Sequence, residues 1–276
     1  MALKMTKKII KEFILVLLTL VFILPLYYGA INAFKSPEEI SLHPFTIWFS
    51  TFTFQYIIEF FNKAKYLQSL LVSSSITILA VGALIFLCSM ASYPLARIRS
   101  KIFKYYYLVI VAAIVLPFEI ALIPLLVLLK SLHLMYTIGG VVLVHVAWNA
   151  PFAIFLYTGY MKTIPKELEE SAIVDGCGMF RTYIKILFPL LKPITAALVI
   201  LLGYWIWNDF LVAYVVLNAA NQLTLQVALY YCFGKFLKQY NLLFAGAILT
   251  SVPILILFIA TQKNFIKGIT AGAVKG

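Results

Sequence analysis

Charged side chains are scarce in this sequence, and acidic ones are the scarcest. Only 10 of the 276 residues are Asp or Glu, and all charged residues together make up 12% of the chain. Soluble domains carry about twice that share. With 63% hydrophobic residues and a mean hydropathy of +1.00, the composition excludes a soluble globular domain.

The residues and motifs of metal and catalytic sites are also missing. The three cysteines (Cys88, Cys177 and Cys232) and the three histidines are scattered without metal-ligand spacing, so neither a disulfide framework nor a zinc site is predicted. The sequence has no G-x-x-x-x-G-K-[ST] loop, no H-E-x-x-H pair and no G-x-S-x-G elbow. We therefore expect no catalytic residue, no metal and no cofactor on this chain. If ATP powers the activity of this chain, the hydrolysis takes place on another subunit.

Long uncharged stretches dominate what is present. A helix needs about 20 apolar residues to cross the hydrocarbon core of a bilayer. Six stretches meet this length, and no segment between them is long enough to bury a core of its own. The prediction is an all-α membrane protein in which residues 1–276 form one domain, with six transmembrane helices at about 13–34, 68–95, 105–129, 137–161, 190–212 and 241–262.

Positive charge is distributed unequally between the two sides of these spans. The net charge is +12, and 16 of the 22 Lys and Arg residues fall on the side that holds both termini. Basic loops stay in the cytoplasm, so both termini are predicted to be cytoplasmic. The first apolar run is too long for a cleaved signal peptide and is interpreted as the first span. Topology explains the basic excess, so no nucleic-acid partner is expected.

Four of the ten acidic residues lie in one segment, "KELEESAIVDG" at 166–176, between the fourth and fifth spans. Pro165 suits a first helical position, and acids in the opening turns suit the helix dipole. Asp175 and Gly176 then end the helix, because glycine readily adopts the left-handed conformation of a C-terminal cap. Three- and four-residue spacing predicts a narrow apolar stripe formed by Ile164, Leu168, Ala172 and Ile173.

Two interpretations of this short helix are open. A helix that lies on lipid headgroups is usually rich in Lys and Arg, whereas this one is acidic and would be repelled by anionic lipid. An acidic helix with a stripe of small and apolar residues better suits a groove in a cytoplasmic protein. The predicted topology puts the helix on the cytoplasmic side, which favours the second interpretation.

The same segment resembles the EAA loop of ABC importer permeases. The family pattern is E-A-A, three residues, G, nine residues, I, one residue and L-P; here Ser171 replaces an alanine and Phe188 replaces the leucine. In that family the loop forms a coupling helix that docks on the ATPase subunit. The resemblance implies a cytoplasmic coupling segment at 163–189, with coupling residues Glu167, Glu169, Glu170, Ser171, Ala172, Asp175, Gly176, Ile186 and Pro189.

Three other stretches are similar to the carbohydrate-uptake (maltose-type, MalG-like) branch of these permeases. They are "FKSPEEI" at 34–40, "WNDF" at 207–210 and the C-terminal "FIKGITAGAVKG" at 265–276. The resemblance implies a type I ABC importer transmembrane domain, which forms half of a sugar path in a bacterial or archaeal plasma (inner) membrane. It further implies a homologous second permease, two ATPase subunits that use ATP and Mg, and an extracytoplasmic sugar-binding protein.

Other transport classes remain open at this stage. The same loop would serve an importer of a non-sugar solute such as a polyamine or phosphate. An ion-coupled carrier that acts alone is a further alternative.

Aromatic and polar residues near the end of the fifth span are candidates for the substrate path. Trp205 and Trp207 can stack on the apolar faces of sugar rings, and Asn208 and Asp209 can bond to hydroxyl groups. The alternative is an aromatic belt at the outer membrane interface, with Asp209 reaching the headgroups.

Two polar residues in other spans are further candidates. Glu119 interrupts the third span, and an acid inside a membrane is costly enough to count as a functional-site hypothesis. Asn149 lies in the fourth span within "HVAWNAP", where the alternative is that polar side chains hold membrane helices together.

Overall fold

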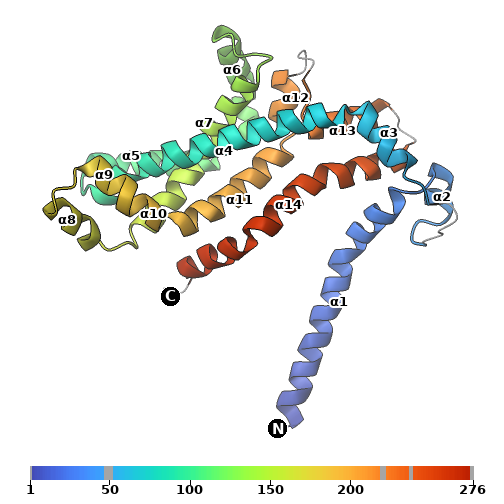
Figure 1. Ribbon diagram of the computed structural model, residues 1–276, viewed down its shortest axis with the longest axis horizontal. Helices are drawn as coiled ribbons and strands as arrows, with labels where there is room; N and C mark the ends of the chain where they lie inside the picture. The colour runs from blue at the N-terminus through green and yellow to red at the C-terminus, as the bar shows by residue number, and fades with distance from the viewer. Residues whose placement is uncertain (1, 47–51, 218–221, 236–238, 274–276) are drawn as a thin grey trace. The chain divides into compact units, whose positions relative to one another are not determined.

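The computed structural model describes residues 2–46, 52–217, 222–235 and 239–273, and this part of the chain is helical with no strand. Figure 1 shows the order of its elements, and the expected all-α membrane fold is confirmed. The α-helices are α1 (Ala2–Asn32), α2 (Pro37–Leu42), α3 (Gln55–Lys63), α4 (Tyr66–Arg97), α5 (Lys101–Ala112), α6 (Phe118–Ser131), α7 (Ile138–Met161), α8 (Glu167–Val174), α9 (Met179–Thr182), α10 (Phe188–Leu190), α11 (Lys192–Asn208), α12 (Leu211–Leu217), α13 (Leu225–Lys235) and α14 (Tyr240–Ala273).

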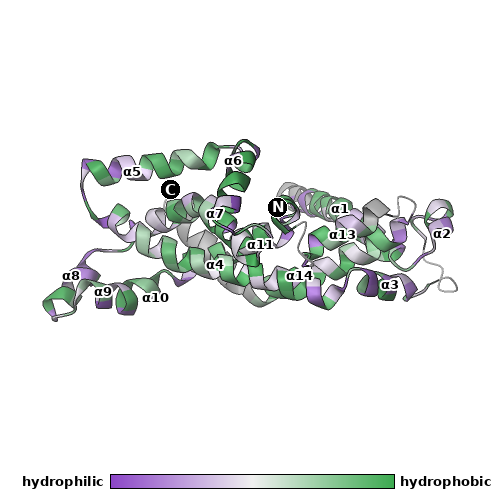
Figure 2. Ribbon diagram, turned by 90° about the horizontal axis from the view of Figure 1, so that it is seen from above, coloured by the Kyte–Doolittle hydropathy of each residue, from purple (hydrophilic) through white to green (hydrophobic). Residues whose placement is uncertain are grey.

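Four helical stretches in the described residues are long and apolar enough to cross a membrane. They are Lys8–Asn32, Tyr66–Arg97, Ile138–Met161 and Tyr240–Ala260. Two bent pairs raise the number to six if each pair is one span, namely Lys101–Val115 with Phe118–Ser131 and Met179–Leu190 with Lys192–Asn208. In Figure 2 the membrane helices are mostly hydrophobic, while hydrophilic residues gather on α8 and at the start of α5.

The third predicted span is not one straight helix. Its two halves meet at an angle of 104°. At the break, Leu116 and Pro117 both have extended backbone, with ψ angles of 127° and 133°. Proline has no N–H for the helix ladder and pushes the preceding residue out of the helical region. Pro117 therefore ends the first half, and α6 begins directly after it.

The fifth predicted span also breaks, close to the "WNDF" motif. Helix α11 ends at Asn208, and Asp209 is extended with a ψ of 127°. The backbone N–H of Ala213 donates to Asp209 Oδ2 at 3.2 Å. A carboxylate that accepts from the first turn of a helix caps it, so Asp209 ends α11 and stabilises the start of α12.

The chain divides into two compact units, 1–69 with 225–253 and 70–224 with 254–276. In the first unit, Tyr66 Oη donates to the carbonyl of Leu249 at 2.9 Å, and Gly246 lies so close to Phe60 that a Cβ would be 2.4 Å from its ring. Buried Lys35 donates to the carbonyl of His43 at 2.7 Å. Burial lowers the pKa of this ammonium group, and nearby Glu39 partly offsets the effect.

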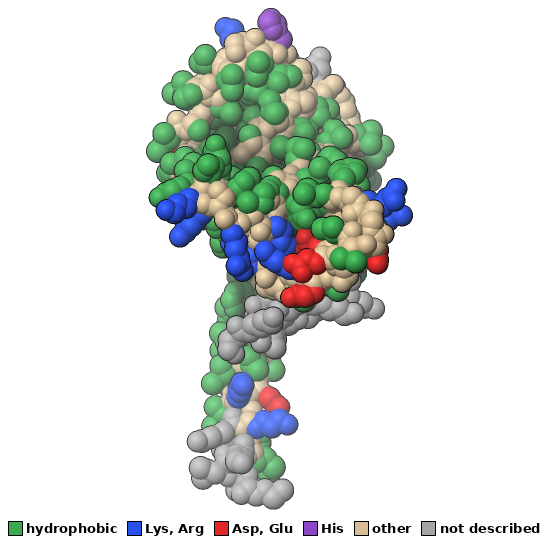
Figure 3. Space-filling model, turned by 90° about the vertical axis from the view of Figure 1, so that its left-hand side faces the viewer, with side chains coloured by type: hydrophobic (Ala, Val, Ile, Leu, Met, Phe, Trp, Pro, Cys, Tyr) green, Lys and Arg blue, Asp and Glu red, His purple; other side chains and the backbone are tan. Residues whose placement is uncertain are grey.

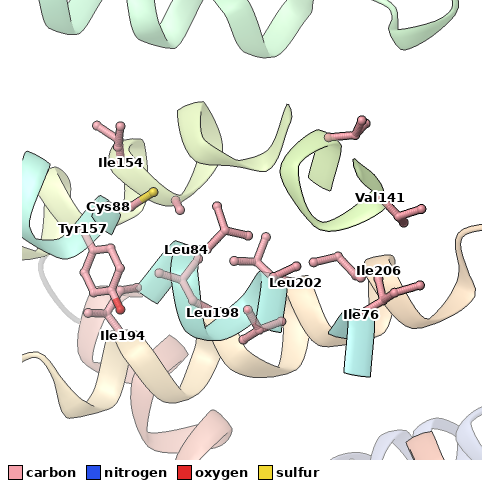
Figure 4. Close-up of a cluster of buried hydrophobic side chains, with 14 of the residues drawn as sticks. Ile76, Leu84, Cys88, Val141, Ile154, Tyr157, Ile194, Leu198, Leu202 and Ile206 are labelled. Atoms are coloured by element: carbon pink, nitrogen blue, oxygen red, sulfur yellow. The ribbon is translucent and has the colours of Figure 1, made fainter. Parts of the chain in front are cut away.

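The core of the second unit is built from stripes with four-residue spacing. Helix α11 contributes one such stripe, α4 contributes a second, and α7 packs beside them. In Figure 4 the side chains of these helices meet in one cluster. Lipid tails are as apolar as leucine, so close packing stabilises such a cluster more than removal from water does. The two stripes are Val72, Ile76, Ala80, Leu84 and Cys88 on α4, and Ile194, Leu198, Leu202 and Ile206 on α11.

Hydrogen bonds between side chains of different elements also stabilise the second unit. Tyr183 Oη donates to Ser89 Oγ at 2.7 Å. The hydroxyl groups of Tyr157 and Thr195 are hydrogen-bonded at 3.0 Å. Polar side chains of this kind commonly join membrane helices. Here the first bond connects α4 to the π-helical segment Tyr183–Leu187, and the second connects α7 to α11.

Some predicted features fall partly outside the described residues. The tail resemblance at 265–276 includes 274–276, which lie outside them, and α14 covers the preceding residues as far as Ala273. The single-domain organisation stays a prediction.

Candidate functional site

The acidic segment forms α8, which begins at Glu167, two residues later than Pro165. It ends as predicted at a left-handed glycine, since Gly176 has a φ of +81°. The N–H of Cys177 donates to the carbonyl of Ala172 at 2.9 Å, and that of Gly176 to the carbonyl of Ile173 at 3.0 Å. This pair of bonds is the Schellman motif, and it turns the chain toward α9.

Glu169 points inward from α8 and attaches this helix to the end of α4. Its Oε1 accepts from Arg97 Nε at 2.7 Å, and its Oε2 accepts from Tyr93 Oη at 3.0 Å. The side chains of Arg97 and Glu169 are only 10% and 8% exposed. Arg97 also donates through Nη2 to the carbonyl of Ile164 at 3.2 Å. Glu169 therefore fixes the position of α8, and its side chain is not available for contact with another protein.

The predicted apolar stripe of α8 is only partly correct. Ile164 and Ala172 are buried within the chain, whereas Leu168 and Ile173 are 45% and 55% exposed, so the four residues do not form one face. The reason is that Glu169 and Ala172, three residues apart, form the inward face of the helix. The inward face is thus a salt bridge plus one alanine, and larger apolar side chains turn outward.

The outward side of α8 and α9 combines acids with exposed apolar side chains, and we call it the α8–α9 surface. Val174, Met179 and Phe180 are 85%, 69% and 62% exposed. Figure 3 shows acidic side chains gathered on this end of the molecule, with hydrophobic ones between them. Exposed apolar patches rimmed by polar residues mark interaction sites. The exposed polar members from the predicted coupling set are Glu167, Glu170, Ser171 and Asp175.

The later members of the predicted coupling set lie on the return to the core. Ile186 is half-buried in the π-helical segment, and Pro189 is exposed in α10. Pro189 has no N–H to give to the carbonyl of Lys185, and such gaps in the ladder favour π-bulges. Leu187 and Leu191, on either side of Pro189, are fully buried. This part of the motif attaches the segment 163–189 to the core.

A separate cavity of about 370 Å³ gathers four of the six predicted substrate-path residues. Glu119, Asn149, Trp205 and Asp209 all line it, although they come from three different predicted spans. The other two lie elsewhere. Trp207 is buried at 7% exposure, and Asn208 donates through Nδ2 to the carbonyl of Tyr204 at 2.9 Å.

His145 and Trp148 also line this cavity, although neither was among the predicted substrate-path residues. Nε2 of His145 lies 3.7 Å from Asp209 Oδ2. Trp148 packs edge-on against Phe118, with ring centroids 4.9 Å apart. His145, Trp148, Asn149 and Phe152 follow helical spacing on one face of α7, and that spacing was the available signal.

The polar groups of the cavity sit beside aromatic walls. Trp205 is 44% exposed and packs against Phe152 at 4.9 Å between centroids. A second cavity of about 240 Å³ shares Trp148, Asn149 and Trp205 with the first. Indole faces next to carboxylate and amide groups can bind a ligand that has both apolar faces and hydroxyl groups.

Glu119 does not interrupt a continuous helix. It lies exposed in the first turn of α6, after the break at Pro117. A helix N-terminus favours a carboxylate, so this position costs less than the middle of a span. In the described part of the chain, no three His, Cys, Asp or Glu side chains gather into a candidate metal site.

The fold is similar to solved structures of one kind of transporter. A bacterial ABC transporter involved in the import of the acidic polysaccharide alginate matches with a TM-score of 0.77 at 21% identity, over 94% of this chain and 96% of that one. The same kind of transporter, in complex with alginate pentasaccharide-bound periplasmic protein, matches with a TM-score of 0.64. At 21% sequence identity, this similarity establishes a shared fold and no more.

Sequence relatives cover nearly the whole chain. A probable starch degradation products permease, AmyC of Thermoanaerobacterium thermosulfurigenes, is 31% identical over 98% of this chain and 97% of its own. The melibiose/raffinose/stachyose import permease MelC of Bacillus subtilis is 34% identical over 87% and 83%. The arabinooligosaccharides permease AraQ of Halalkalibacterium halodurans is 35% identical over 92% and 91%.

The resemblance first drawn from the acidic segment is therefore confirmed at the level of the family. The family described as the binding-protein-dependent transport system inner membrane component matches residues 84–270, a range that contains both α8 and the cavity. This chain belongs to the binding-protein-dependent transport system inner membrane components, the permease subunits of ABC importers.

Proposed function

We propose that this permease forms half of the path for a sugar or oligosaccharide in an ATP-driven importer. The observation that carries the proposal is the cavity in which Trp148 and Trp205 lie beside Asp209 and Asn149. Indole faces stack on the apolar faces of sugar rings, and the polar groups bond to hydroxyls. The names of relatives that import starch degradation products, raffinose-type sugars and arabinooligosaccharides support the same substrate class.

The energy source in this proposal lies outside the chain. Two ATPase subunits bind ATP and Mg, and the α8–α9 surface docks on one of them, while a homologous second permease supplies the other half of the path. An extracytoplasmic sugar-binding protein delivers the substrate on the opposite side. The acids and exposed apolar side chains of the α8–α9 surface fit a groove in a soluble partner.

Transport in this scheme is alternating access. Closure of the ATPases on ATP favours an outward-open arrangement of the helices, and hydrolysis returns them to the inward-open one. Glu169 supports this transmission, because its bonds to Arg97 and Tyr93 make α8 move with the end of α4. Both termini lie in the cytoplasm, on the side of α8.

The test is ATPase activity of the reconstituted importer with its binding protein, measured across a panel of saccharides. Stimulation by one group of sugars, with no response to polyamines or phosphate, is the expected result. If only a polyamine or phosphate stimulates the ATPase activity, that solute and not a sugar is the substrate. Transport by the purified chain without any ATPase would instead establish an ion-coupled carrier.

A further inference from the structure

A third and larger cavity lies apart from the two substrate-path cavities and borders the α8–α9 surface at Glu167. It has a volume of about 730 Å³ and is formed by the end of α4, the first turns of α5 and the link from α7 to α8. Its lining is strongly basic. Glu167 is its one acidic residue, against six cations, Arg97, Arg99, Lys101, Lys104, Lys162 and Lys166. We call it the basic pocket.

Three of these cations already interact with the protein. Arg97 pairs with Glu169, Lys166 Nζ donates to the carbonyl of Arg97 at 3.3 Å, and Lys162 Nζ lies 4.9 Å from the centre of the Tyr107 ring. In the described part of the chain, no carboxylate forms an ion pair with the other three cations, Arg99, Lys101 and Lys104.

The backbone adds to the positive potential of the basic pocket. Ser100 caps α5, because its Oγ accepts from the N–H of Ile102 at 3.3 Å. Ser100 and Lys101 line the pocket, so the N-terminus of this 12-residue helix opens into it. A helix N-terminus carries partial positive charge and favours an anion. The unpaired cations and the helix end thus favour the same kind of ligand.

The basic pocket lies where three membrane helices end. Arg97 is the last residue of α4, Lys101 is the first of α5, and Lys162 directly follows α7. The apolar stretches of these helices put this level at the membrane surface. Figure 3 shows the Lys and Arg side chains beside the acidic ones on this end of the molecule.

Exposed apolar and amphipathic side chains continue from the pocket along α5. Ile98 and Ile102 are 49% and 63% exposed, and Tyr105 and Tyr106 are 67% and 61% exposed. Tyrosine is enriched at the headgroup level of membranes. A ligand with a phosphate group and attached acyl chains matches both the cations and this apolar continuation. An acidic protein surface would match the cations alone.

We propose that the basic pocket binds the phosphate headgroup of an anionic phospholipid, of which phosphatidylglycerol is the probe. Basic pockets at the ends of membrane helices bind such headgroups through charge and hydrogen bonds. Arg97 belongs to this pocket and also holds Glu169 of α8. The bound lipid therefore stabilises the position of the coupling segment. This inference rests on the membrane family of the chain and not on the sugar, so its failure leaves the proposed function intact.

The test uses the purified importer complex with the full-length chain, titrated with phosphatidylglycerol and followed by native mass spectrometry. The variant is Lys101→Gln with Lys104→Gln, and the control is Lys8→Gln with Lys11→Gln, which removes the same charge from exposed positions on α1. Each cation contributes about fivefold to binding of anionic lipid. The pocket variant should bind phosphatidylglycerol about 25-fold more weakly, and the control should bind it like the unaltered protein. Equal melting temperatures in detergent verify that both variants fold.

Further titrations identify the source of the phosphate. Two results support an anionic phospholipid as the ligand. Zwitterionic phosphatidylcholine should bind weakly, and inorganic phosphate at the same concentration should not displace phosphatidylglycerol. Displacement by inorganic phosphate would overturn the proposal in favour of a free-phosphate site. Unchanged lipid binding in the pocket variant would also overturn it. Loss of the ATPase subunits from that variant, with lipid binding unchanged, would identify a protein-docking surface.

Discussion

At the scale of single residues, the molecule uses its few charges in pairs and at helix ends. Glu169 is buried against Arg97 and Tyr93, while Asp209 caps a helix and faces His145. A carboxylate away from water is tolerated only when it is paired or hydrogen-bonded. The scarcity of acids in the sequence therefore makes each acid informative about structure.

Glu169→Gln should destabilise the protein. The substitution keeps the size of the side chain but leaves the guanidinium of Arg97 buried without a counter-charge, which typically costs about 3–5 kcal/mol. The measurement is the free energy of unfolding of the purified chain in detergent. Glu59→Gln is the control, because Glu59 forms a more exposed pair with Lys63, and such pairs contribute about 0–1 kcal/mol. Equal losses in the two variants would contradict the structural role of Glu169.

Trp205→Ala should impair transport more than it impairs stability. Trp205 lines both cavities, and loss of one aromatic contact of about 1.5 kcal/mol lowers affinity about tenfold. We expect a fall of about that size in sugar uptake by proteoliposomes that contain the whole importer. Tyr204→Ala is the matched control, since Tyr204 is an exposed aromatic residue of the same helix that does not line either cavity. A similar fall in both variants would show that Trp205 has no specific role in the substrate path.

At the scale of helices, the sequence predicts where elements exist better than where they bend or which way they face. Long apolar runs require helices in a membrane, so α4 and α7 were predictable. The 104° bend at Pro117 was not, because membrane helices often tolerate proline and only the local packing decides. The inward orientation of the Glu169 side chain could not be predicted either, because its partner Arg97 is 72 positions away in the sequence.

The end of α8 offers a sharp comparison of two glycines. Gly176 has a φ of +81°, whereas Gly178 has an ordinary φ of −68°, and a Cβ at either position would have no atom within 4 Å. Gly176→Ala forces a left-handed alanine, which costs about 1–2 kcal/mol. It should therefore weaken association of the permease with its ATPase in a pull-down of the detergent-solubilised complex. Gly178→Ala should assemble like the unaltered protein, and an equal loss in both variants would show that the left-handed conformation of Gly176 is not what assembly requires.

At the scale of the whole molecule, much of the apolar surface has no partner within the chain. The most apolar window of α1 is 0% buried, and lipid or a second subunit accounts for such a surface in a membrane protein. The α8 part of the α8–α9 surface is different, because α8 is a polar helix outside the candidate spans and still exposes Ile173 and Val174. Lipid does not explain that patch, so a soluble partner is the simpler explanation.

Docking through the α8–α9 surface predicts that one aromatic side chain contributes much of the affinity. Phe180 is 62% exposed, and truncation of a central aromatic residue in an interface typically costs about 2 kcal/mol or more, which is about 30-fold in affinity. Phe180→Ala should lower binding of the ATPase to the permease by about that factor, measured with both proteins in detergent. Leu42→Ala is the control, because Leu42 is 73% exposed on α2, in the loop predicted on the opposite side of the membrane. If Phe180→Ala binds the ATPase as tightly as Leu42→Ala does, the α8–α9 surface is not the coupling interface.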